Sequence, residues 1–275
     1  MRSSILFLVR CLWHRYTRHD VSHQAAALAY FLLFSLFPIL ILASRLIGAL
    51  DLSDLLSTLR HILPERVLAL VESYLFYAAE HTGRSLLWFS AIFSVWFPMR
   101  ATDCLMHAVR RAYSLAEPQH PLLYRVKVLL YTILLLLSIA LTALVAAISR
   151  SAIAALAALL GLPEVFARLW NLFRFAAVGL IIFGALTALY ATAQDHRIFL
   201  TKILQGAALS TLAWMAFSAV YSFYTEFFAN YDLVYGARST VAVVLIWLYL
   251  SAIALIMGAE LNAALALDLR RNDHP

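Results

Sequence analysis

Residues 241–259 read VAVVLIWLYLSAIALIMGA, a run of nineteen residues without one charged side chain. At a rise of about 1.5 Å per residue, a helix of this length approaches the roughly 30 Å thickness of the hydrocarbon core of a bilayer. Similar apolar runs recur along the chain, where a soluble domain would have turns. The sequence therefore predicts an all-α membrane protein.

The overall composition points the same way. Hydrophobic residues make up 64% of the chain and charged residues 13%, against roughly 45–50% and about 25% in soluble domains. The net charge of +6 is spread over the gaps between apolar runs, which argues against a nucleic-acid-binding face. Cys11 and Cys104 are the only cysteines, so neither a disulfide framework nor a thiolate metal site is expected.

Hydropathy along the chain predicts six transmembrane helices, which together form a single domain over residues 1–275. The second is the least regular, because its clean apolar run from Leu86 to Pro98 is short. The predicted spans are 25–45, 86–108, 126–149, 169–190, 203–227 and 239–265.

The distribution of basic residues predicts the orientation of these spans. The two termini and the 109–125 and 191–202 loops, with the adjoining helix ends, carry 13 of the 21 Lys and Arg residues. By the positive-inside rule, both termini are expected in the cytoplasm. We therefore expect a multi-pass protein of the bacterial inner membrane.

The first extracytoplasmic segment, 46–85, is not patterned like a linker. Leucines recur at helical spacing after Asp51, and a second amphipathic stretch begins at Pro64. Two short amphipathic helices are expected here, either on the outer leaflet or across the mouth of the bundle.

Ionisable residues inside a span usually face the interior of the bundle. In the second span, Arg100, Asp103, His107 and Arg110 fall within about 80° on one helical face. One interpretation is that both arginines extend to the headgroups while Asp103 neutralises Arg100. The other is a polar interior that binds an anion, a lipid headgroup or a proton.

The last span carries Glu260 and Asn262 near its cytoplasmic end. We expect Glu260 to pair with an arginine of the second span, Arg100 first, or else with the cytoplasmic end of the first span around Gln24. Such a pair would be either an inner gate or a structural clasp. Ala254 and Gly258, four residues apart, predict close helix packing.

Catalytic motifs are absent from the sequence. It contains no HExxH, GxSxG, P-loop or dinucleotide fingerprint, and its nine histidines lack the spacing of metal ligands. We therefore expect no enzymatic activity, no metal and no cofactor.

Two segments resemble a known family. They are ALAYFLLFSLFP at 27–38 and the region from GAALSTLAW at 206–214 to WLYLSAIALIMGAELNA at 247–263. Both are similar to the YihY/BrkB family of bacterial inner-membrane proteins, and the order of the other spans also fits. The resemblance implies six helices with both ends inside. Members of that family are labelled virulence factors and were formerly called ribonuclease BN, and lipid export has been suggested for some.

The expected function is a transporter or flippase-like protein for a lipid or another amphiphile. The alternative is a non-transporting membrane scaffold or envelope-integrity factor. Membrane lipids are the expected partners, and nucleic acid is not. A second copy of the chain or another envelope protein is a further partner that the exposed helical faces could accept.

Overall fold

The structure is a computed structural model of a helical bundle. It describes residues 2–47, 68–73, 83–116, 118, 120–147, 153, 165–193, 200–227 and 237–272. All regular secondary structure in these ranges is helical, as the composition predicts. The long helices are α1 (Arg2–Arg18), α2 (Val21–Ile47), α5 (Arg84–Ala112), α6 (Pro121–Ala147), α8 (Val165–Thr192), α9 (Leu200–Phe227) and α11 (Ala237–Asn272).

Four of these helices contain a stretch long and apolar enough to cross a membrane: Val21–Leu42, Pro121–Thr142, Ile203–Tyr221 and Val241–Leu265. In α8 the apolar stretch is shorter, Ala176–Thr192. In α5 the apolar run is interrupted by charged residues. The chain is therefore a multi-pass helical protein, whereas the crossing of the membrane by α5 and α8 remains a prediction.

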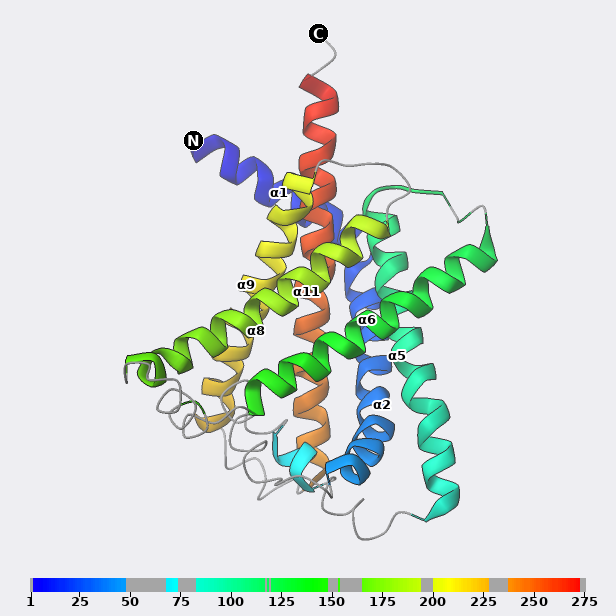
Figure 1. The fold of residues 1–275 in the computed structure, drawn as a ribbon. Helices are drawn as coiled ribbons and strands as arrows, with labels where there is room; N and C mark the ends of the chain where they lie inside the picture. The colour runs from blue at the N-terminus through cyan, green and yellow to red at the C-terminus, as the bar shows by residue number, and fades with distance from the viewer. Residues whose placement is uncertain are drawn as a thin grey trace.

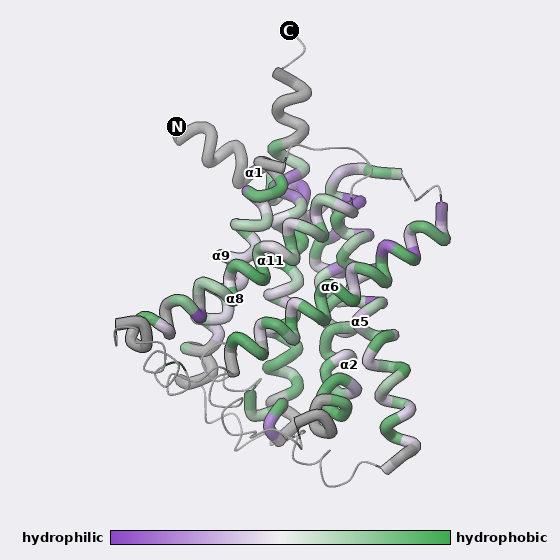
Figure 2. The backbone as a smooth tube through the Cα atoms, in the orientation of Figure 1, coloured by the Kyte–Doolittle hydropathy of each residue, from purple (hydrophilic) through white to green (hydrophobic). Residues whose placement is uncertain are grey.

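The bundle is organised around α11. This helix packs on α2 and α9, α5 packs on α2, and α8 lies between α6 and α9. Figure 1 shows α1 and the last turns of α11 projecting from the same end of the bundle, which we call the α1 end. Hydrophilic residues gather mainly toward this end, and hydrophobic ones follow the helices away from it (Figure 2).

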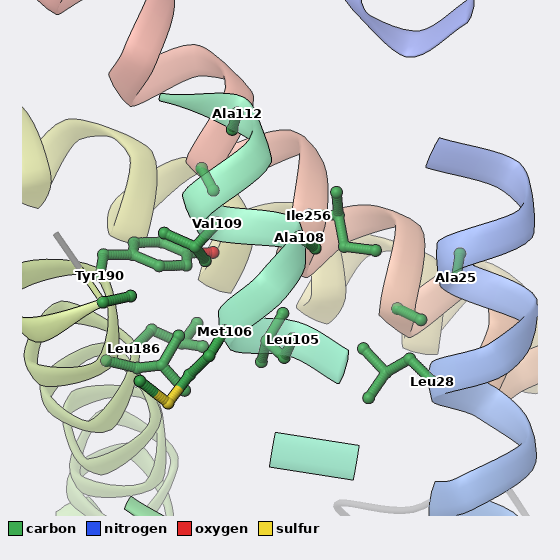
Figure 3. Close-up of a cluster of buried hydrophobic side chains, with 14 of the residues drawn as sticks. Ala25, Leu28, Leu105, Met106, Ala108, Val109, Ala112, Leu186, Tyr190 and Ile256 are labelled. Carbon is green, nitrogen blue, oxygen red and sulfur yellow. The ribbon is translucent and has the colours of Figure 1, made fainter. Parts of the chain in front are cut away.

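Small and branched apolar side chains form one main core near the α1 end. Val109 of α5, Leu189 of α8 and Ile256 of α11 are fully buried in it. Figure 3 shows Met106 of α5 beside Leu186 of α8 in the same cluster. The core thus joins α5, α8 and α11 where the polar residues of interest are found.

Segment 46–85, between α2 and α5, is where short amphipathic helices are predicted. The short amphipathic helices of segment 46–85 lie largely outside the described residues. The described turn, 68–73, is helical, and its Leu68 and Val71 are buried, Val71 against Leu40 of α2. The helix α1 forms in the basic N-terminal segment, ahead of the first predicted span.

Candidate functional site

Glu260 of α11 forms a buried ionic cluster with two residues from the N-terminal segment. We call Arg15, His19 and Glu260 the clasp. Arg15 Nε donates to Glu260 Oε2 at 2.7 Å, and His19 Nδ1 lies 2.6 Å from Oε1. The Glu260 side chain is 1% exposed. An isolated buried carboxylate would be strongly destabilising, so these two partners account for its presence in the interior.

A tight corner between α1 and α2 holds the clasp residues in place. Asp20 adopts φ 51°, in the left-handed region, where Asp is several-fold enriched. The backbone N–H of His19 donates to the carbonyl of Arg15 at 2.9 Å, and the Gln24 side-chain amide donates to the carbonyl of His19. The backbone of His19 is therefore fixed while its ring reaches Glu260.

Arg15 also connects the clasp to the end of α5. A guanidinium N–H donates to the carbonyl of Ala112, in the last turn of that helix. Carbonyls there have no partner within the helix and carry partial negative charge, so a cation is favourable. Ser114, with φ 53°, and the 3.0 Å bond from Leu115 N to the Arg110 carbonyl close this helix in a Schellman motif.

The prediction that Glu260 pairs with Arg100 is wrong. Arg100 donates to Asp103 on its own helix, and Glu260 instead binds Arg15 and His19. The reason is α1, which packs against α11 and brings in two partners absent from the prediction. The alternative region near Gln24 is closer, although Gln24 contacts the carbonyl of His19 and not Glu260.

Asn262 joins α11 to α9 through both atoms of its amide. Its Oδ1 accepts from the backbone N–H of Gly206 at 2.7 Å, and its Nδ2 donates to the Ile203 carbonyl at 3.2 Å. The side chain is fully buried. These bonds satisfy a polar group that would otherwise be unpaired inside the bundle.

The helices α9 and α11 approach so closely that neither glycine at their contact has room for a side chain. A Cβ on Gly258 would lie 1.8 Å from Ser210 Oγ and 2.6 Å from the Gly206 carbonyl. Ser210 Oγ donates to the carbonyl of Ala254 at 3.0 Å, and the Tyr190 hydroxyl lies 2.8 Å from Ser210 Oγ. We call this contact, with Asn262, the α9–α11 seam, and it contains both predicted packing residues.

A second polar group lies on α5 and is much more open. We call Arg100, Asp103 and His107 the charged row. Arg100 Nη1 donates to Asp103 Oδ2 at 3.0 Å, and His107 Nε2 lies 3.5 Å from Asp103 Oδ1. The Tyr124 hydroxyl of α6 donates to Oδ1 at 3.1 Å. The Arg100 side chain is 47% exposed and that of His107 56%.

Contacts with α2 fix the depth of the charged row. The Arg100 guanidinium lies 5.5 Å from the centre of the Phe31 ring, a cation–π contact. Phe31 is ten residues into the apolar stretch Val21–Leu42, or about 15 Å along the helix. The Cys104 thiol, one residue beyond Asp103, donates to the Gln24 carbonyl at 3.6 Å. The row therefore runs from near the α1 end to about the middle of the span.

Arg110, the fourth residue of the predicted stripe, has a different environment. It is buried, and it donates to the carbonyls of Ala193 at 3.3 Å and Ala116 at 2.6 Å. The Arg110 guanidinium binds carbonyls that follow α8 and α5, so this side chain does not extend to the headgroups. Arg110 therefore joins two helix ends and is not part of the charged row.

Several residues at these sites were not predicted from the sequence. Arg15 and His19 are four residues apart, the spacing that places two side chains on one helical face, and this was the available signal. Tyr124 and Tyr190 carry no such signal, because aromatic residues are frequent throughout the chain. Among the described residues, no group of three His, Cys, Asp or Glu side chains could hold a metal ion.

Comparisons with known proteins give a consistent result. A family model described as virulence factor BrkB matches residues 12–275. YfkH of Bacillus subtilis (strain 168), named as a ribonuclease-like protein, is 31% identical over 92% of this chain and 93% of its own length. UPF0761 membrane proteins of Alkalilimnicola ehrlichii and Chromohalobacter salexigens are 28% and 27% identical over 92% and 94% of the chain. The chain spans only 56% and 63% of those two relatives. No solved structure matches.

Proposed function

We propose that this chain, a multi-pass membrane protein that belongs to the virulence factor BrkB family, moves a lipid or another amphiphile across the bilayer in the manner of a flippase. In this proposal the charged row of α5 receives the polar headgroup. The apolar part of the molecule remains in the surrounding lipid.

The observation that carries the proposal is an exposed guanidinium beside the middle of a helical stretch long and apolar enough to cross a membrane. Arg100 is 47% exposed and lies against Phe31, ten residues into the stretch Val21–Leu42. A charged residue at the bilayer centre is unfavourable by at least about 2.5–3.5 kcal/mol. Ionisable residues at such depth commonly mark the path of a substrate or ion. A polar headgroup that enters the membrane at Arg100 supplies a charged hydrogen-bond partner for the guanidinium, which lipid tails cannot supply.

An aromatic surface next to the charged row suits the apolar part of the substrate. The rings of Tyr30 and Phe34 lie 4.6 Å apart, and that of Phe97 lies 5.6 Å from Phe34. Phe93 and Phe89 continue the series along α5, away from the α1 end. Acyl chains can pack along these rings while the headgroup is held at Arg100.

The proposal includes a topology. We place six spans in the inner membrane, adding α5 and α8 to the four apolar helices, with both termini in the cytoplasm. The support is the share of basic residues, 13 of 21, on one side, together with the projection of α1 and α11 from one end (Figure 1). In this orientation the charged row begins at the cytoplasmic leaflet.

A non-transporting scaffold or envelope-integrity factor is the second candidate. It is favoured by the clasp and the α9–α11 seam, where burial and close packing leave no obvious freedom for the helices to move. A scaffold would use exposed helical faces to bind a second copy or an envelope protein. We propose no enzymatic activity. Asp20 is paired with His23, Asp103 with Arg100 and Glu260 with Arg15. Among the described residues no three His, Cys, Asp or Glu side chains converge on a metal position, whereas phosphodiester hydrolysis by metal ions uses convergent ligands.

Reconstitution into liposomes tests the transport proposal. The purified chain is incorporated with fluorescent phospholipids, and movement between leaflets is followed by chemical quenching of the outer leaflet. We expect movement above the rate of empty liposomes, and a loss of at least about tenfold, or 1.4 kcal/mol in activation free energy, in Arg100→Gln.

Arg111→Gln is the matched control, because Arg111 is an exposed arginine of the same helix outside the charged row. This variant should retain the wild-type rate. No movement above empty liposomes for any of several lipid classes would rule out transport and leave the scaffold. Equal losses in both variants would mean that the charged row has no special role.

A further inference from the structure

We propose, on the basis of the function proposed above, that the amphiphile is a phospholipid with a zwitterionic headgroup. Its phosphate binds Arg100 and its ammonium group binds Asp103. The charged row thus recognises both charges of one headgroup by exchanging an internal ion pair for an external one.

The charge balance of the site is the first step. Arg100 and Asp103 contribute one charge of each sign, and they are joined by a single 3.0 Å hydrogen bond. A zwitterionic headgroup replaces each partner by a group of the same sign, so no charge is left unpaired. A purely anionic headgroup takes Arg100 and leaves the Asp103 carboxylate with only the His107 ring, 3.5 Å away, and the Tyr124 hydroxyl as partners among the described residues. Losing the guanidinium at membrane depth is unfavourable.

The unused hydrogen-bonding capacity is the second step. A guanidinium has five N–H donors in a planar fork suited to phosphate. Within the described part of the chain, Arg100 uses one of them, toward Asp103. Asp103 accepts from Arg100 and from Tyr124, while a carboxylate has about four acceptor positions. Both residues can therefore bind a headgroup before their own bond is broken.

Accessibility is the third step. The Arg100 side chain is 47% exposed and that of Asp103 21%, so both members of the pair are at least partly accessible. The clasp offers no comparable site, because Glu260 is 1% exposed and bound on both oxygens. Only the charged row combines opposite charges, membrane depth and exposure among the described residues.

The chemistry of the headgroups also predicts an order of binding strength among phospholipids. The primary ammonium of phosphatidylethanolamine donates hydrogen bonds to a carboxylate, whereas the quaternary ammonium of phosphatidylcholine has no N–H. Charge-assisted hydrogen bonds are roughly twice as strong as neutral ones. We therefore expect the order phosphatidylethanolamine, phosphatidylcholine, phosphatidylglycerol, from the strongest to the weakest.

Two measurements test the inference separately from transport. Binding of the three lipids to the purified full chain is measured by native mass spectrometry, and their movement is measured in liposomes. We expect phosphatidylethanolamine to exceed phosphatidylglycerol by at least about tenfold in binding. Asp103→Asn should reverse this order, because Arg100 then presents an uncompensated positive charge. The binding of the three lipids is also compared in His107→Gln. This variant shows whether the order depends on the third ionisable group of the row.

Asp20→Asn is the control for net charge. Like Asp103→Asn, it removes one carboxylate, but at a position that is 56% exposed and outside the row. Asn also tolerates the left-handed backbone at that position. The control should keep the wild-type order. Equal or tighter binding of phosphatidylglycerol by the wild type overturns the inference even if lipids move. Selective binding without movement supports the inference and overturns the transport proposal.

Discussion

Glu260 and Asp103 are two carboxylates within the apolar helices, and the structure holds them in opposite ways. Glu260 is 1% exposed and is bound by Arg15 and His19, which come from a different helix and its corner. Asp103 is 21% exposed, and both of its basic partners lie within four residues on α5. The comparison teaches that a buried carboxylate bound by distant partners fixes the fold, whereas a partly exposed one with local basic partners can exchange them for a ligand.

The largest expected effect comes from breaking the clasp. Glu260→Gln should lower the free energy of unfolding by about 3–5 kcal/mol, because the Arg15 guanidinium loses the charge that compensates it. Thermal and denaturant unfolding in detergent would measure it, with Arg15→Gln and the double variant completing a thermodynamic cycle. A loss below about 1 kcal/mol, typical of an exposed pair, would show that the clasp is not the closed cluster described.

A smaller loss is expected at the α9–α11 seam, where no charge is involved. Gly258→Ala places a Cβ 1.8 Å from Ser210 Oγ, and overpacking of this kind destabilises by about 1–3 kcal/mol. Gly184→Ala is the matched control, because nothing lies within 4 Å of a Cβ there. The control should be neutral or slightly stabilising, since Ala favours a helix over Gly by about 0.5–1 kcal/mol. Similar results for both variants would contradict the close approach of the two helices.

The smallest effect on stability is expected at the charged row. The double variant Arg100→Gln, Asp103→Asn removes both charges together, so neither is left unpaired. Its free energy of unfolding should stay within about 1 kcal/mol of the wild type, while movement of phosphatidylethanolamine in liposomes is lost. If this variant unfolds as readily as Glu260→Gln, the row is a structural element and the contrast with the clasp disappears.

Much of the fold could be predicted, because hydropathy depends on local composition. The helices around 25–45 and 239–265 are present, and each extends beyond its predicted bounds as α2 and α11. The partner of Glu260 could not be predicted in the same way, because it depends on how α1 turns at Asp20. Nothing local in the sequence indicates that a chain segment 245 residues away would pack against α11 at Glu260.

The polar stripe of the second span illustrates the same limit. Helical periodicity correctly placed Arg100 and Asp103 within reach of one another. It could not distinguish Arg110, which shares the stripe but is buried against the carbonyls that end α5 and α8. Tyr124 and Tyr190 were missed because their roles arise from neighbouring helices. Periodicity thus predicts which residues share a face and not which helix covers it.

The clasp can form only at a late stage of the synthesis of the chain. Arg15 and His19 are synthesised first, and Glu260 follows 245 residues after Arg15. At about 5–20 residues per second, Arg15 and His19 are synthesised roughly 12–50 s before the carboxylate that they contact. Until α11 has been inserted, Arg15 and His19 lack the carboxylate that they contact in the finished protein. A chain that stops short of its last helix therefore lacks the main surface against which its basic N-terminal helix packs.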